Sequence, residues 1–202
     1  DTKFRIQLKI QKQIGLFDSH FALGEGIKRE IESMYGQRNI QVVYNPIKES
    51  QEFALVNPKR FLYIGRIDAN KRVMELLQTL KKIQGEWHLD IFGSTGDTDS
   101  DLYFEKWLRG DEVLSEKVLF HGWKENVWDA ILALNSTGVL LLNSRSEGSP
   151  LVLVEAMMRG VPCVASDCPV GPSDIIVPGT NGWLYPMNDE NICLSILQKI
   201  VD

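Results

Sequence analysis

The sequence predicts an α/β domain with a Rossmann-like, doubly wound parallel sheet, and three observations support this fold class. Short apolar runs alternate with longer segments of helical periodicity between residues 59 and 185, which is the pattern of βαβ units. Each apolar run ends at a glycine or a small polar residue. The composition, with 44% hydrophobic and 24% charged residues in a chain of 202, is that of an ordinary globular protein.

The predicted strands and helices alternate along this part of the chain. The expected strands are 61–65, 88–93, 118–122, 139–143 and 162–166. The expected helices, identified by apolar residues at helical spacing, are 72–83, 102–108, 127–134, 150–159 and 190–201. In such a sheet, ligands bind beyond the carboxyl ends of the strands, where the glycine-containing loops gather.

Residues 1–56 follow a different pattern. The expected elements are a polar amphipathic helix through Lys12, a strand at 20–23, a helix at 25–35 and an extended segment at 42–47. The dipeptide Asn45-Pro46 is typical of a boundary, because the residue before a proline avoids the helical region. We therefore expect one segment with its linker at 1–47 and a domain at 48–202.

Charge, cysteines and hydropathy exclude several classes of protein. The net charge of −5 argues against a nucleic-acid surface, which needs clustered Lys and Arg. The three cysteines, Cys163, Cys168 and Cys193, lack C-x-x-C spacing, so we expect reduced thiols in a cytosolic protein. No charged leader or long apolar run is present. Because the chain begins without Met and ends within a helical pattern, we expect a piece of a longer protein.

The first candidate site is the segment 145–160, RSEGSPLVLVEAMMRG. Ser149 as the N-cap and Pro150 as the first helical residue predict a helix that begins just after Glu147-Gly148 and ends at a glycine. The free N–H groups and the dipole at this helix start favour an anion such as a diphosphate.

Glu155 lies in this helix among apolar residues, where an ionised carboxylate is costly without a partner. It stands roughly 7–8 Å along the helix axis, at a distance suited to the vicinal hydroxyls of a ribose attached to the diphosphate. Glu147 would then face the group at the other end of the diphosphate. The alternative is that Glu155 pairs with an Arg or Lys and that Glu147 is a solvated loop residue.

The second candidate site is the segment 61–72, FLYIGRIDANKR. A strand ends at Gly65, Arg66 follows, and Lys71 opens the next helix, so both cations are expected over the carboxyl edge of the sheet. Arg can hold phosphate oxygens in a fork, while Lys supplies a movable point charge. The alternative is that Lys71 and Arg72 form a solvated helix start.

These motifs together resemble the retaining GT-B glycosyltransferases of glycosyltransferase family four. The resemblance runs from Tyr44 to the end of the chain, through YIGRIDANKR, LDIFGSTGD, VLFHGW, SRSEGSPLVLVEAM, GVPCVASD and PGTNGWLYP. It implies that 48–202 is the nucleotide-sugar-binding domain, the C-terminal half of a GT-B fold whose final helix is truncated. It also implies that 1–47 is the tail of the N-terminal acceptor domain and the linker.

The resemblance implies a role for each candidate residue. Arg66 and Lys71 neutralise the diphosphate beside Gly65, and Glu155 holds the ribose hydroxyls. Glu147 and the backbone of the next residues hold the donor sugar, and these are Gly148, Ser149, Pro150 and Leu151. Trp123 and Lys124 border the base. The catalytic candidates are Arg66, Lys71 and Glu147, and no metal or other cofactor is expected. The family commonly has E-G-F-G where this chain has Glu147-Gly148-Ser149-Pro150, so a proline without an N–H replaces a backbone donor.

The resemblance further implies transfer of a hexose from a nucleotide sugar, with retention, to a glycan or lipid-linked acceptor. The stretch CPVGPSDIIVPGTNG resembles galactosyltransferases that build bacterial lipopolysaccharide or surface polysaccharide, which points to a UDP-hexose donor. The implied location is cytoplasmic, with peripheral association at the inner face of the membrane. The acceptor site belongs to the missing part, so the chain alone is expected to be inactive, and His20, His88 and His121 are expected to be structural.

The sequence is also compatible with two other functional hypotheses. The stretch Asp97 to Asp101, DTDSD, contains D-x-D twice and could ligate Mn²⁺ or Mg²⁺ in a GT-A-like enzyme, or it could simply cap the next helix. The chain could also be a non-catalytic nucleotide-binding module. A dehydrogenase-like domain is disfavoured, because no G-x-G-x-x-G follows the first strand.

Overall fold

The computed structural model describes residues 16–36 and 39–202. The chain divides into two compact units, Asp1–Pro46 and Ile47–Asp202. The helix expected through Lys12 lies outside the described residues.

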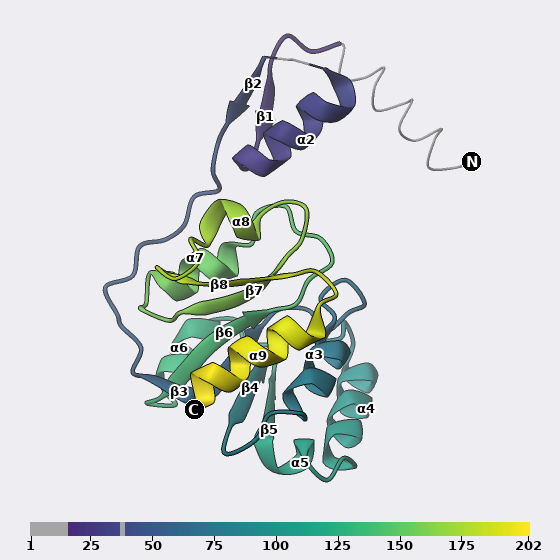
Figure 1. The fold of residues 1–202 in the computed structure, drawn as a ribbon, viewed down its shortest axis with the longest axis vertical. Helices are drawn as coiled ribbons and strands as arrows, with labels where there is room; N and C mark the ends of the chain where they lie inside the picture. The colour runs from purple at the N-terminus through teal and green to yellow at the C-terminus, as the bar shows by residue number, and fades with distance from the viewer. Residues whose placement is uncertain (1–15, 37–38) are drawn as a thin grey trace, which may run out of the picture. The chain divides into compact units, whose positions relative to one another are not determined.

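The first unit contains a helix and a small parallel sheet. Strand β1 (His20–Ala22) pairs in parallel with β2 (Ile40–Val42), and helix α2 (Glu25–Tyr35) connects them (Figure 1). The predicted bounds of α2 are confirmed. The extended segment expected at 42–47 overlaps β2 at Val42, and the N–H of Val43 still donates to the carbonyl of Ala22 in β1.

The second unit is a six-stranded parallel sheet with helices on both faces (Figure 1). Its strands are β3 (Val56–Ile64), β4 (His88–Phe92), β5 (Val118–Gly122), β6 (Thr137–Leu142), β7 (Cys163–Asp167) and β8 (Gly182–Pro186). Its helices are α3 (Val73–Leu80), α4 (Thr98–Arg109), α5 (Leu114–Lys117), α6 (Val127–Leu132), α7 (Leu151–Met157), α8 (Pro172–Ile175) and α9 (Glu190–Val201). The predicted fold class is therefore confirmed.

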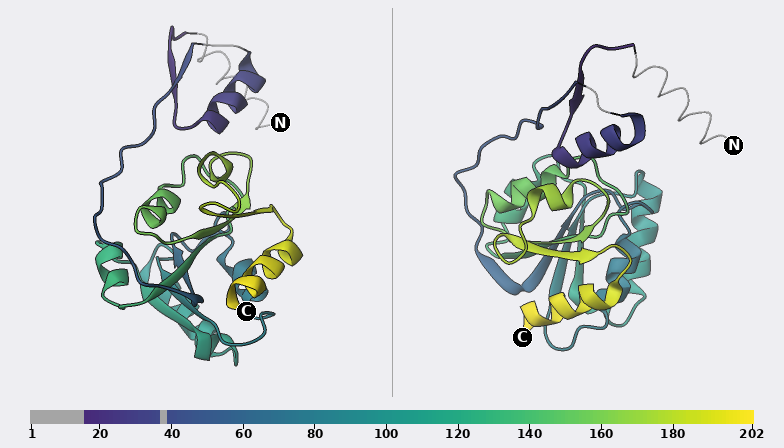
Figure 2. Two further views of the ribbon diagram at one scale, coloured as in Figure 1. Left: turned by 60° about the vertical axis from the view of Figure 1, so that its left-hand side comes forward. Right: turned by 45° about the horizontal axis from the view of Figure 1, so that its top comes forward.

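The strand order is β5-β4-β3-β6-β7-β8, so the chain starts in the middle of the sheet and builds it outward in both directions. One apolar cluster packs α3, α4 and α9 on one face, and a second packs α6 and α7 on the other (Figure 2). The direction of winding reverses between β3 and β6. Ligands of doubly wound sheets bind at such a switch point, beyond the carboxyl ends of the strands.

All five predicted strands and all five predicted helices are present, with shifts at several ends. Strand β8 is a strand that the sequence reading missed. Helix α4 begins at Thr98 rather than at residue 102, because the Asp97 carboxylate accepts a hydrogen bond from the backbone N–H of Ser100 and caps the helix.

The predicted start of α7 needs correction. The helix begins at Leu151, and Pro150 occupies the N-cap position with no side-chain cap from the described residues. Ser149 is therefore not the cap, and its carbonyl accepts from the N–H of Leu151 at 2.9 Å in a tight turn. The helix ends near Gly160, whose φ of +74° is left-handed, as glycine after a helix commonly is.

In the described part of the chain, helices are too short or too polar to cross a bilayer.

Candidate functional site

Two loops meet at the switch point, one following β3 and one following β6. Asn70, in the first loop, accepts a hydrogen bond from the Ser146 hydroxyl at 2.9 Å and donates to the Ser146 carbonyl at 3.0 Å. Its own carbonyl accepts from the N–H of Arg145 at 2.8 Å. Asn70 thus joins the two candidate segments, a role that the sequence reading missed.

Lys71 and Glu147 form an ion pair across these loops. The Lys71 Nζ lies 2.5 Å from the Glu147 Oε1, with side-chain exposures of 19% and 9%. The N–H groups of Lys71 and Asn70 both donate to the Asp68 carboxylate, each at 2.9 Å, which fixes the turn that carries the lysine. The alternative of a solvated Glu147 is therefore wrong, and the two predicted residues come together.

Arg72 is buried, so the alternative of a solvated helix start is wrong for it. It is 6% exposed and occupies the N-cap of α3 with a left-handed φ of 52°. Its guanidinium donates to the Asn188 side chain at 2.8 Å, and its carbonyl accepts from Asn143 at 3.0 Å. Asn143 in turn accepts from the Tyr185 hydroxyl at 2.7 Å. This network holds the residue next to Lys71 in a conformation that costs energy for a non-glycine residue.

Arg66 points into solvent at the same edge of the sheet. Its side chain is 77% exposed and lies 3.2 Å from the Asp68 carboxylate. Its carbonyl accepts from the hydroxyl of Tyr63 at 2.5 Å, and burial raises the pKa of that tyrosine well above its ordinary value. The backbone of Arg66 is therefore fixed, while its guanidinium, paired with Asp68 at the surface, is exposed to a ligand.

A cavity of about 310 Å³ lies beside Arg66. It is lined by Ile64, Gly65, Arg66, Phe92, Gly93, Ser94, Gly96, Trp123, Lys124 and Val127. Four of these residues, Gly65, Arg66, Trp123 and Lys124, are predicted site residues. Trp123 is 67% exposed, so its flat ring is available to a planar ligand. The volume falls within the range of about 300–1,000 Å³ that is usual for small-molecule sites.

Glu155 has a partner, but that partner is not a cation. Its Oε2 accepts a hydrogen bond from the indole Nε1 of Trp128 at 3.0 Å. The Arg159 guanidinium lies over the Trp128 ring, 4.6 Å from its centroid, and donates to the backbone carbonyl of Glu155. Among the described residues no Arg, Lys or His forms an ion pair with Glu155, so the alternative of a salt-bridged Glu155 has no support in that part of the chain. The other carboxylate oxygen has no recorded partner in the described chain.

The turn from Glu147 to Leu151 packs against Gly171. A Cβ at Gly171 would lie 2.7 Å from the Pro150 Cδ and 3.2 Å from the Glu147 Cβ, and the residue has a φ of +103°. Only glycine fits here without displacing the turn. Gly171 is a further residue that the sequence reading missed, although the run Gly171-Pro172 after β7 was visible as a turn signal.

The acidic stretch at 97–101 serves the local fold. Asp97 caps α4, and Asp101 accepts hydrogen bonds from the hydroxyls of Ser94 and Thr95 at 2.9 and 2.8 Å. This arrangement fits the capping explanation of DTDSD. Within residues 16–36 and 39–202, groups of three or more His, Cys, Asp or Glu side chains suited to a metal ion are absent.

The cysteines are free and buried. Burial raises the pKa of Cys163 to about 12 and that of Cys193 to about 11, so these thiols stay protonated at neutral pH. His121 pairs with the buried Asp90 at 2.7 Å and stacks on Phe92 with ring centroids 4.3 Å apart. These contacts agree with a structural role for His121.

The geometry defines a Rossmann-like α/β domain in which the loops after β3 and β6 meet through the Lys71–Glu147 ion pair and a cavity lies beside Arg66. The model of the family "Glycosyl transferases group 1" matches residues 46–199, and the chain belongs to that family. The resemblance inferred from the sequence motifs is thereby confirmed.

Individual relatives agree with this assignment. The chain is 36% identical over 178 residues to a lipopolysaccharide 1,6-galactosyltransferase from Salmonella typhimurium, covering 83% of the chain and 48% of that protein. It is 32% identical over 193 residues to one of the same name from Escherichia coli K12, covering 91% and 52%. The solved structure of the lipopolysaccharide outer core galactosyltransferase WaaB in its apo form aligns with a TM-score of 0.80 at 34% identity, covering 91% of the chain and 53% of that structure. The chain spans about half the length of the curated relatives, as expected for the C-terminal half of a GT-B fold.

Proposed function

We propose that this chain is the donor-binding half of a hexosyltransferase that uses a nucleotide sugar, a UDP-hexose, in the synthesis of bacterial surface polysaccharide or lipopolysaccharide. One observation carries the proposal. The loops after β3 and β6 bring the predicted residues Lys71 and Glu147 into contact at the switch point of the sheet. The galactosyltransferase names of the relatives and the motif CPVGPSDIIVPGTNG support a hexose donor.

Each residue has a defined part in the proposed site. Trp123 and Lys124 border the base in the cavity beside Gly65, and Glu155 accepts hydrogen bonds from the ribose hydroxyls through its unshared oxygen. Arg66 and Lys71 contact the diphosphate. The donor sugar contacts Glu147 and the backbone of the residues up to the start of α7, which are Gly148, Ser149, Pro150 and Leu151.

The proposed chemistry is electrostatic. As the sugar leaves, negative charge develops on the nucleoside diphosphate, and fixed cations that face this charge lower the barrier most. Lys71 is held in place by its turn and by Glu147, whereas the exposed Arg66 closes on the phosphates when they bind. The proposal includes retention of configuration and no metal requirement, so the charge on the diphosphate is met by protein cations and α7.

The acceptor belongs to the rest of the whole enzyme. We propose a glycan or lipid-linked acceptor bound through the N-terminal domain, whose tail and linker are residues 1–47, while residues 48–202 bind the donor. The whole enzyme would act in the cytoplasm, at the inner face of the membrane. The 202-residue chain alone is expected to bind donor without turning it over.

Isothermal titration calorimetry with the 202-residue chain tests the proposal. UDP, UDP-galactose and UDP-glucose should bind, and NAD should not. EDTA should leave UDP binding unchanged. Tight NAD binding without UDP binding, or loss of UDP binding in EDTA, would contradict the proposal.

Glu155→Ala should remove most of the UDP affinity and leave the fold intact, because its partner is the neutral Trp128 indole and the unpaired N–H costs only about 1–3 kcal/mol. Glu105→Ala is the matched control, because that carboxylate pairs with Arg109 on α4. If Glu155→Ala keeps wild-type UDP affinity, Glu155 does not bind the ribose.

A further inference from the structure

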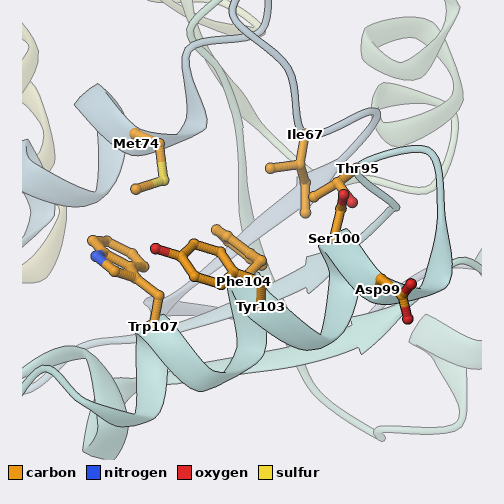
Figure 3. A pocket seen from close by; sticks show the side chains of 8 residues that line it. All are labelled: Ile67, Met74, Thr95, Asp99, Ser100, Tyr103, Phe104 and Trp107. Carbon is orange, nitrogen blue, oxygen red and sulfur yellow. The ribbon is translucent and has the colours of Figure 1, made fainter.

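A second and larger pocket lies next to the proposed donor cavity. Its volume is about 580 Å³. The lining residues are Ile67, Met74, Thr95, Asp99, Ser100, Tyr103, Phe104 and Trp107 (Figure 3). Ile67 lies one residue beyond Arg66, and Thr95 lies between Ser94 and Gly96, which line the donor cavity. The same two loops, after β3 and after β4, therefore contribute to both cavities.

Aromatic rings and Met74 form the apolar end of this pocket. Tyr103 and Trp107 project from α4, and Met74 projects from α3 toward them (Figure 3). Tyr103 is 74% exposed and Met74 is 41% exposed, so a ligand could cover both. Phe104 is buried beneath, in contact with Trp107 at a centroid distance of 6.1 Å and edge-on to Phe120 at 5.2 Å. Packing against the hydrophobic core thus holds the aromatic side chains of the pocket in place.

Polar groups form the other end of the pocket, around the start of α4 (Figure 3). The hydroxyls of Thr95 and Ser100 are hydrogen-bonded to Asp101 and Asp97. The Asp99 carboxylate has no side-chain partner among the described residues, and the same holds for the Tyr103 hydroxyl. The pocket therefore offers a ligand two groups for hydrogen bonding, the Asp99 carboxylate as acceptor and the Tyr103 hydroxyl as donor.

The charge of the lining narrows the class of ligand. The lining holds one carboxylate and no Lys or Arg, so a phosphate or another anion would meet repulsion from Asp99 without any compensating cation. A purely apolar chain would cover Asp99 and remove it from water without a hydrogen-bond partner, which is unfavourable. A neutral ligand with one apolar face and several hydroxyls satisfies both ends.

We propose that this pocket binds a neutral sugar ring, with its C–H face on Tyr103 and Met74 and its hydroxyls on Asp99. Sites for small ligands commonly combine apolar and aromatic walls with a few polar groups that fix orientation. As a subsite for a sugar unit of the acceptor glycan, the pocket rests on the proposed function. Sugar binding itself is independent of that function and can be measured without donor.

Saturation-transfer NMR with the 202-residue chain tests the pocket, using maltose and lactose as probes. Both should receive saturation, strongest on the ring hydrogens of one face. Tyr103→Ala and Asp99→Asn should each weaken the binding about tenfold, equivalent to about 1.4 kcal/mol. Leu102→Ala is the matched control, since Leu102 is 59% exposed on the same helix but does not line the pocket, and it should leave binding unchanged.

The outcomes separate this inference from the proposed function. UDP titrations of wild type and Tyr103→Ala should be the same, because Tyr103 does not line the donor cavity. If the sugars receive saturation but UDP does not bind, the proposed donor site is wrong and the proposed sugar pocket is retained. Absence of saturation in a chain that binds UDP would overturn the pocket alone. Equal sugar binding by wild type and both pocket variants would also overturn it.

Discussion

Lys71 and Glu147 form a largely buried pair, and replacement of Lys71 by methionine should therefore destabilise the chain even without ligand. The methylene stem of the lysine is preserved in methionine, so packing changes little. What changes is the charge, because Glu147, 9% exposed, is left without its cation. An unpaired carboxylate in this position must either remain ionised in a poor environment or become protonated.

The magnitude follows from the burial and the distance. A unit-charge pair 4 Å apart gains about 4 kcal/mol at an effective dielectric constant of about 20, and loss of one partner of a buried pair costs about 3–5 kcal/mol. Lys71 keeps 19% of its side chain in solvent, so the lower end, about 3 kcal/mol, is expected. For a chain of this size, that corresponds to a fall in the melting temperature of about 6–12 °C.

Differential scanning calorimetry of a double-mutant cycle measures this effect. Glu147→Gln alone should cost less, about 1 kcal/mol, because Lys71 can turn its ammonium toward water. The double variant Lys71→Met with Glu147→Gln should recover most of the stability lost in Lys71→Met. Lys82→Met is the control, since Lys82 pairs with Glu190 at 3.5 Å with both side chains about half exposed, and such pairs contribute about 0–1 kcal/mol. Equal melting temperatures for the single Lys71→Met variant and the double variant would refute the argument.

Two further changes test other parts of the site, and a third tests the buried Asp90 beside it in the sheet. Gly171→Ala should destabilise the chain by about 2 kcal/mol through backbone strain and should also weaken UDP-hexose binding, measured by calorimetry, because the new Cβ displaces the turn that starts at Glu147. Trp128→Phe keeps an aromatic side chain but removes the N–H that donates to Glu155. The UDP dissociation constant should therefore rise about five- to tenfold in a titration. Burial raises the pKa of Asp90, but hydrogen bonds from His121 and Arg60 outweigh it and hold that pKa below its ordinary value. The resulting stabilisation is complete above the unfolded pKa and is lost as pH falls through the lower folded-state pKa. Asp90→Asn should therefore flatten the acid limb of the stability curve, measured by urea unfolding, below about pH 4.

The Gly171 and Trp128 variants each have a control, and all three changes have an outcome that would contradict them. Gly179→Ala meets no atom within 4 Å at a φ of +79°, so it should show strain alone, and equal loss of donor affinity in both glycine variants would contradict the steric argument. Trp183→Phe is the control, because it replaces an indole in β8 that is 37% exposed. If Trp183→Phe lowers the UDP affinity as much as Trp128→Phe does, the N–H of Trp128 has no specific role. An unchanged acid limb in Asp90→Asn would show that Asp90 does not contribute to the pH dependence.

Periodicity was sufficient to predict the sheet and its main helices. Buried parallel strands are continuous apolar runs, and the helices between them repeat on one face. Strand β8, Gly182–Pro186, was missed because its glycine, proline and exposed Trp183 resemble a loop. It is a strand because β7 pairs with it along five positions, and pairing with a distant segment leaves no local signal.

The contacts within the site were harder to predict than its residues. Spacing identified Lys71, Glu147 and Glu155, but their partners come from segments that are distant in sequence. Asn70 binds Ser146, 76 positions away, and Trp128 binds Glu155, 27 positions away. A single sequence carries no record of such pairs, so neither the Lys71 partner of Glu147 nor the Trp128 partner of Glu155 could be predicted from residue spacing.

The contact between Lys71 and Glu147 also bears on how the proposed donor would be recognised. Without ligand, the lysine is already neutralised by Glu147, so a diphosphate must compete with that carboxylate for the same ammonium. A free phosphate would gain little from this exchange, because Glu147 would be left unpaired in a poorly solvated position. A donor that brings a sugar beside its phosphate gives Glu147 hydroxyl donors at the moment when it loses Lys71. The pair therefore favours ligands that carry both groups, and the selectivity for a nucleotide sugar over a bare anion would arise from the cost of separating two residues that hold each other in place.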